Sequence, residues 1–182
     1  MLRATMRDII RAEIANIDPF DDLENAHISD TLEWIDAGAD LFRTAKPATP
    51  PRHLISYFVL MDGDHVLLVD HINAQLWLPT GGHVEPNENP RETVKREAFE
   101  ELGIEADFAF PSPVFLTVTE TVGRTAGHTD VSLWYVLKGD RNEQLDFDRS
   151  EFQEIRWFRG DHVPFSRSDP HMKRFMSKLE LF

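Results

Sequence analysis

The chain has 182 residues, a formal net charge of −13 and no cysteine. Its length suits one domain, or one domain with an appended segment, and the lack of cysteine excludes a disulfide framework, a thiolate zinc site and a cysteine nucleophile. The acidic charge without a basic patch, and the lack of a long apolar stretch or a signal peptide, favour a soluble cytoplasmic protein that binds neither nucleic acid nor membranes.

The first 50 residues are predicted to form a helical segment that precedes the main domain. Apolar residues recur at helical spacing over residues 2–17, so we expect an amphipathic helix that ends before Asp18. Residues 29–30 could cap a second short helix that closes near Gly38. The apolar stripe of the first helix is expected to pack on the main domain or on a second subunit, which makes a homodimer a candidate assembly.

A proline-rich stretch at residues 46–51 indicates an extended linker, so we expect a segment at 1–50 and a main domain at 51–182. Residues 53–61 and 66–69 predict a hairpin, and further strands are expected at 75–78, 113–121, 129–137 and 154–158. A closing helix is expected at 169–181. Strands and helices mix without a βαβ repeat, which predicts an α+β fold, or an α/β fold with a mixed sheet.

Residues 90–102 carry the strongest helix signals in the chain. Asn89 is suited to cap the helix, Pro90 to occupy its first position and Gly103 to end it. Glu92 stands where a capping box places its acid. We therefore expect a helix with well-defined ends.

One face of this helix is expected to carry three glutamates, Glu97, Glu100 and Glu101. Carboxylates held so close repel one another, and a hard divalent cation bound to their oxygens would offset the repulsion. A solvated acidic face explains the helix alone equally well, because glutamate is a good helix former. Gly81 and Gly82 upstream favour the cation, because their backbone can approach a ligand closely.

Residues 82–104 resemble the Nudix box, whose pattern is G-x5-E-x7-R-E-U-x-E-E-x-G-U, with U an aliphatic residue. Every fixed position is filled, although Ala98 is small for the first U and Thr80 stands where the family often has proline. The likeness in strand order extends from about residue 53 to the C-terminus. It implies a Nudix-type α/β/α sandwich around a mixed sheet, here with an N-terminal helical extension, and hydrolysis of a nucleoside diphosphate linked to another group.

The resemblance also implies roles for individual residues. Mg²⁺ or Mn²⁺ would be held by Glu97, Glu100, Glu101 and the carbonyl of Gly82. Arg96 would orient the neighbouring Glu97, and Glu88 would support the box. Substrate phosphate would meet Gly81, Gly82 and His83.

An acid outside the box is a further candidate for catalysis. Family members often add such a glutamate, and Glu151 and Glu154 lie in the region just before the late strand. Glu151 is the first choice by its spacing to Trp157, Glu154 is the alternative, and Glu120 is a weaker candidate. A base within the box would be Glu97.

The substrate expected by default is a nucleoside triphosphate. Downstream signatures typical of ADP-ribose, diadenosine polyphosphate and NADH hydrolases are absent. The alternative is a catalytically silent Nudix-like module that binds nucleotides or regulates, but such modules usually lose box residues. An isopentenyl-diphosphate isomerase shares the fold but uses a cysteine, which this chain lacks.

Aromatic and histidine side chains offer weaker signals. Five aromatics could stack a base, but strands bury aromatics anyway, so a core role is predicted first for Phe58, Trp77, Phe115, Trp134 and Tyr135. The spacing of His65, His71 and His83 matches no metal site, and His128 beside Asp130 is interpreted as a structural histidine.

Overall fold

A mixed sheet forms the centre of the computed structural model, which describes residues 4–46, 48–121 and 127–182. Within those residues the sheet has seven strands, and its main path runs β3-β2-β1-β6-β5, with β4 paired to β1 and β7 paired to β2. Strands β1 and β6 are parallel, and the other pairs are antiparallel. The strands are β1 (Arg52–Asp62), β2 (His65–His71), β3 (Leu76–Leu78), β4 (Thr80–His83), β5 (Phe115–Glu120), β6 (Thr129–Lys138) and β7 (Phe152–Arg159).

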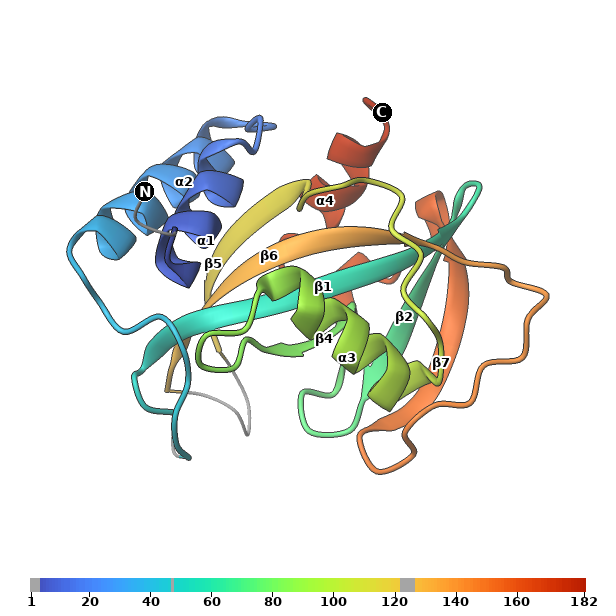
Figure 1. The fold of residues 1–182 in the computed structure, drawn as a ribbon. Helices are drawn as coiled ribbons and strands as arrows, with labels where there is room; N and C mark the ends of the chain where they lie inside the picture. The colour runs from blue at the N-terminus through green and yellow to red at the C-terminus, as the bar shows by residue number, and fades with distance from the viewer. Residues whose placement is uncertain (1–3, 47, 122–126) are drawn as a thin grey trace.

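Helices cover both faces of this sheet (Figure 1). They are α1 (Met6–Ala15), α2 (Asp22–Asp36), α3 (Pro90–Leu102) and α4 (Met172–Leu179), with short 3-10 turns at Gly160–His162 and Phe165–Arg167. Successive side chains of a strand point to opposite faces, so Phe58 of β1 packs with α1, α2 and α3, whereas Val59 packs with α4. The arrangement is the expected α/β/α sandwich around a mixed sheet.

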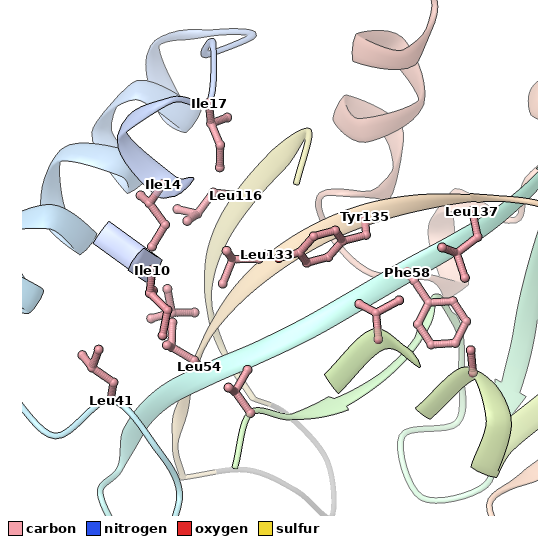
Figure 2. Close-up of a cluster of buried hydrophobic side chains, with 14 of the residues drawn as sticks. Ile10, Ile14, Ile17, Leu41, Leu54, Phe58, Leu116, Leu133, Tyr135 and Leu137 are labelled. Atoms are coloured by element: carbon pink, nitrogen blue, oxygen red, sulfur yellow. The ribbon is translucent and has the colours of Figure 1, made fainter. Parts of the chain in front are cut away.

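The N-terminal helices pack on the sheet of their own chain. Ile10 and Ile14 of α1 are fully buried, and Figure 2 shows them facing the strands that carry Leu54, Leu116 and Leu133. Thr5 begins α1 with a capping box, in which its side chain and that of Asp8 each accept the other's backbone N–H. The apolar stripe of α1 is therefore covered without a second subunit, and the homodimer stays a prediction.

Helix α2 begins earlier than the sequence indicated. Asp21, not residues 29–30, caps it, because the Asp21 side chain accepts the backbone N–H of Glu24 at 2.8 Å. Ser29 lies inside the helix. The buried face of α2 alternates polar and apolar residues: Glu24, Ile28, Thr31 and Ile35. The helical spacing of its apolar residues alone is therefore weak in the sequence.

A buried ion pair joins α2 to α4. Glu24 is completely buried, and its carboxylate lies 2.9 Å from Nζ of Lys178, which also donates to the carbonyl of Asp18. The same carboxylate accepts the backbone N–H groups of Phe20 and Leu116 at 2.7 and 3.1 Å. Every oxygen of the buried charge therefore has a partner, and the pair ties both ends of the chain to β5.

The other predicted elements differ in their bounds. Helix α4 is shorter than the expected 169–181, and β7 begins two residues before the expected 154. Strand β4, with the sequence Thr-Gly-Gly-His, was not expected as a strand because it contains two glycines. It forms because β1 pairs with it, with Ser56 opposite Gly82.

Candidate active site

Two glycines of β4 bring its backbone against both β1 and α3. A Cβ added to Gly81 would lie 2.1 Å from the carbonyl oxygen of Ser56, and Gly81 also has a φ of +152°. A Cβ added to Gly82 would lie 2.0 Å from Oε1 of Glu97. Any side chain at either position would collide, so only this glycine pair lets the strand lie directly beside the glutamates of the helix.

Helix α3 presents its glutamates toward this strand because its apolar stripe is fixed in the core. Val94, Ala98 and Leu102 are all fully buried, as expected. Asn89 caps the helix by accepting the backbone N–H of Arg91 at 2.8 Å, and Gly103 ends it in the left-handed region with a φ of +67°. The expected capping box does not form, since Glu92 pairs instead with Lys95.

Arg96 organises the acidic residues of the box. It donates two hydrogen bonds of 3.1 Å to the two oxygens of Glu88, one to the carbonyl of His83 at 3.2 Å, and one to Oε1 of Glu97. Burial alone would raise the pKa of Glu88, but the bonds from Arg96, the Glu85 amide and Thr93 outweigh it and lower that pKa. The structure thus brings Arg96 to the position expected of a residue that orients Glu97.

The carboxylates of Glu97 and Glu101 are held in a partly desolvated position. Burial is the largest cause that raises the pKa of each. Negative charge on Glu100 and Glu151 adds to the rise for Glu97, and that on Glu97 and Glu151 adds to it for Glu101. For Glu101 the value rises to about 9, although the backbone N–H of Gly81 donates to its carboxylate at 3.2 Å and lowers it. Glu100 is more exposed, with 58% of its side chain accessible, and Arg96 lies 3.6 Å from it.

This donor set fits a hard divalent cation. Glu101 is buried and Glu97 is largely buried, and the charge of Glu97 disfavours ionisation of Glu101. Among the described residues, Arg96 is the one cation in an ion pair with this cluster. Oxygen ligands and excess negative charge are what Mg²⁺ and Mn²⁺ require. Glu97, Glu100, Glu101 and the adjacent carbonyl of Gly82 are the groups that would hold such an ion.

Of the three acids considered outside the box, the structure brings Glu151 to this cluster. Glu151 lies in the turn before β7, lines the same cavity as the box glutamates, and contributes to the raised pKa of Glu97 and Glu101. Glu154 lies within β7 and pairs with Arg156 at 2.6 Å, and Glu120 ends β5. Neither of these two lines the cavity.

The cavity has a volume of about 710 Å³, which is within the range of small-molecule sites. Arg43 and Lys46, from the segment that precedes β1, add positive charge to its wall. Gly81, Gly82 and His83 line it, as expected of residues near a substrate. The five aromatics considered as base platforms are all buried in the core, as first predicted.

A cluster of histidines at one end of the cavity was not found from the sequence. His53, His83, His128 and Asp130, here called the histidine cluster, have ligand atoms within 4.8 Å of one another. They come from three strands, and His53 pairs with Asp130 in the parallel register of β1 and β6. The spacing of residues along the chain carries no information about that register. The cluster therefore could not be found from the spacing of His65, His71 and His83.

Residues 51–179 match the family model of the NUDIX domain. The chain belongs to the Nudix family. It is an enzyme of that family, a pyrophosphohydrolase. Its sequence is 34% identical over 106 residues to the mouse asymmetrical bis(5'-nucleosyl)-tetraphosphatase, a match that covers 58% of this chain and 71% of the mouse protein. The rat protein of the same name is 33% identical over 106 residues, with the same coverage.

Solved structures show the same Nudix fold. A Nudix-family hydrolase from Clostridium perfringens has a TM-score of 0.57 and 21% identity, covering 71% of this chain and 97% of that one. A MutT Nudix hydrolase from Burkholderia pseudomallei has a TM-score of 0.57 and 20% identity, and the match covers 70% of this chain and 98% of the Burkholderia chain. A membrane-spanning helix is not found among the described residues.

The raised pKa of Glu101 predicts how the metal-free Nudix enzyme responds to pH. Its value in the folded state is about 9, against an ordinary 4.5, so between these pH values the folded protein binds more protons than the unfolded chain. The free energy of unfolding should therefore fall as the pH rises through this range. Urea unfolding in EDTA at a series of pH values measures the slope, which Glu101→Gln should reduce. Equal slopes for the two proteins would contradict the assignment.

Proposed function

We propose that this Nudix enzyme hydrolyses a pyrophosphate bond of a nucleoside triphosphate in a reaction that requires Mg²⁺ or Mn²⁺. The observation that carries the proposal is the convergence of Glu97, Glu100 and Glu101 on the glycine backbone of β4. Arg43 and Lys46, which line the same cavity, provide charges that suit a polyphosphate chain. A silent binding module is disfavoured because the complete box retains its acidic cluster.

In this reaction each group of residues in the cavity would have a separate role. A divalent ion held by the box glutamates would neutralise phosphate charge and make water a better nucleophile. Arg96 holds Glu97 in place from one side, and the amide of Gly81 holds Glu101 from the other. Glu151, on the turn before β7 and in the lining of the cavity, would accept a proton from the attacking water. His83 follows Gly82 directly and would lie beside the bound phosphates.

A dinucleoside tetraphosphate is the second candidate substrate. It is favoured by one observation, the similarity to the mouse and rat asymmetrical bis(5'-nucleosyl)-tetraphosphatases. The tyrosine expected downstream of the box in such enzymes is replaced by residues 121 and 122, and residue 122 lies outside the described residues. This difference is the reason the nucleoside triphosphate is placed first.

A substrate panel separates these candidates. Nucleoside and deoxynucleoside triphosphates, diadenosine tetraphosphate and ADP-ribose would each be incubated with the full chain and Mg²⁺, and the nucleotide products separated by chromatography. We expect a nucleoside monophosphate and pyrophosphate from a triphosphate. Preferred cleavage of the tetraphosphate into a mono- and a triphosphate would support the second candidate. No hydrolysis of any compound would leave the silent module as the better account.

A pair of glutamine substitutions tests the role of Glu151. If Glu151 accepts the proton, Glu151→Gln should lower kcat by about 10²–10⁴-fold with little change in KM or in Mg²⁺ affinity. Glu154→Gln is the matched control, since Glu154 lies on the adjacent strand and does not line the cavity. Steady-state kinetics of both variants make the comparison. If Glu154→Gln lost activity while Glu151→Gln kept the kcat of the unmodified enzyme, Glu154 would be the base. If both variants kept that kcat, Glu97 would be the base.

A further inference from the structure

The histidine cluster lies where three strands bring their side chains together. His53 is the second residue of β1 and His83 the last of β4. Asp130 lies beside His53 on β6, with His128 two residues before Asp130. His53 is completely buried, and the rings of His83 and His128 lie 4.9 and 5.0 Å from its ring, measured between centroids. The cluster is therefore part of the packed structure rather than a chance gathering of surface residues.

Polar atoms of the cluster are buried without a hydrogen bond. Among the described residues, Nε2 of His53, Nε2 of His83 and Oδ1 of Asp130 are inaccessible to solvent and make no hydrogen bond. Leaving such atoms unpaired costs about 1–3 kcal/mol each, so a ligand that satisfied all three would be strongly favoured.

The other ring nitrogens fix two of these histidines in a metal-binding orientation. Nδ1 of His53 lies 3.0 Å from the carbonyl of Pro50, which can only accept, so Nδ1 carries the proton and Nε2 the lone pair. Nδ1 of His128 lies 3.2 Å from Oγ1 of Thr121, a contact that holds this ring in place. Metal-binding histidines are held in the same way, by a hydrogen bond from the nitrogen that does not bind the ion.

We propose that the histidine cluster binds one four-coordinate transition-metal ion, Zn²⁺, at a site separate from the box glutamates. Ligand atoms around a tetrahedral zinc ion with bonds of about 2.0–2.1 Å lie about 3.3 Å apart. Oδ1 of Asp130 already lies 3.4 Å from Nε2 of His53 and 3.2 Å from Nε2 of His128. Small side-chain rotations would close the remaining separations, all of which are under 4.8 Å.

The donor set distinguishes this site from the catalytic one. Three imidazoles and one carboxylate suit zinc and its neighbours, whereas the all-oxygen box suits Mg²⁺. Four protein ligands would fill the coordination shell, which is typical of a structural zinc site. The ion would then join β1, β4 and β6 next to Gly82. The positive charge of Arg43, which lines the same cavity, opposes the binding, and the carboxylate of Asp130 offsets it.

The test uses Co²⁺ as a spectroscopic probe and Zn²⁺ as its competitor in the full chain. Glu97→Gln/Glu101→Gln serves as the background, because it weakens the box site and leaves the histidine cluster intact. After treatment with EDTA and dialysis, this protein should bind one Co²⁺ ion with the strong visible absorption of a four-coordinate complex. One equivalent of Zn²⁺ should displace it and raise the melting temperature, because the ion binds the folded state alone.

Substitutions within the cluster decide whether its side chains are the ligands. His128→Ala and Asp130→Asn should each weaken Zn²⁺ binding by at least about 100-fold, more than the loss of a supporting partner would cause. His162→Ala is the control, since His162 is an exposed histidine that does not line the cavity. His53→Ala is less useful because His53 is fully buried, so circular dichroism must first show that it folds. A weak six-coordinate spectrum, or equal Zn²⁺ affinities for His128→Ala and His162→Ala, would overturn the proposal.

Discussion

Replacing Glu101 by glutamine is expected to lower turnover with Mg²⁺ by at least about 100-fold while the protein stays folded. Glutamine keeps an oxygen that can accept the amide of Gly81, but it removes one of the negative charges that a divalent ion requires. The apo protein should not lose stability at neutral pH, because Glu101, with a folded-state pKa of about 9, must take up a proton on folding, and glutamine removes that cost. Steady-state kinetics over a range of Mg²⁺ concentrations measures the loss of turnover.

The same helix offers a matched control for this substitution. Glu92 lies in the first turn of α3, on the solvent side, and pairs with Lys95. Glu92→Gln should therefore leave turnover and Mg²⁺ dependence close to those of the unmodified enzyme. If Glu101→Gln retained full activity, or if Glu92→Gln lost as much as Glu101→Gln, the carboxylates of the box could not be the groups that hold the ion.

Removing one partner of the Glu24–Lys178 pair is expected to cause the largest loss of stability of any single substitution considered. Lys178→Met would leave the buried carboxylate without its counterion, and Glu24→Ala would leave a buried ammonium together with two unpaired backbone amides. Breaking a buried pair in this way typically costs about 3–5 kcal/mol in the free energy of unfolding. Urea unfolding of each variant gives this free energy, provided that its dependence on urea concentration is the same in all variants.

An exposed ion pair between the N-terminal helices provides the comparison. Arg11 and Asp36 form a bidentate pair across α1 and α2, but about half of each side chain is accessible to solvent. Asp36→Asn should therefore change the free energy of unfolding much less than Lys178→Met. Similar losses for the two variants would mean that the buried pair does not hold the N-terminal helices to α4. The replacement of both Glu24 and Lys178 by Met should recover only part of the loss, because the amides of Phe20 and Leu116 would stay unpaired.

Helix α3 could be predicted because its determinants are local in the sequence. Asn89, Pro90 and Gly103 set its ends within one segment, and the glutamates share a face because of the helical period alone. The start of α2 could not be predicted in the same way. Its buried face includes Glu24, whose partner Lys178 lies 154 residues later, and a polar residue at that position weakens the apolar pattern.

The histidine cluster could not be predicted because strand register brings it together. The parallel pairing of β1 and β6 places His53 beside Asp130, and β4 reaches the same place only because its glycines allow close packing against β1. Apart from His128 and Asp130, the residues of the cluster are far apart along the chain, and their spacing matches no known metal-binding motif. His53 and His83 are 30 residues apart along the chain and become neighbours only when it folds.

The measurement that tests the central account most directly is hydrolysis in H₂¹⁸O, with mass spectrometry of the products. A nucleoside triphosphate would be incubated with the full chain and Mg²⁺, and parallel reactions would contain EDTA or the Glu101→Gln variant. The account predicts one ¹⁸O atom in either the nucleoside monophosphate or the pyrophosphate, formed with Mg²⁺ and nearly abolished in both parallel reactions. Labelled products that form equally well in EDTA and with Glu101→Gln would contradict it.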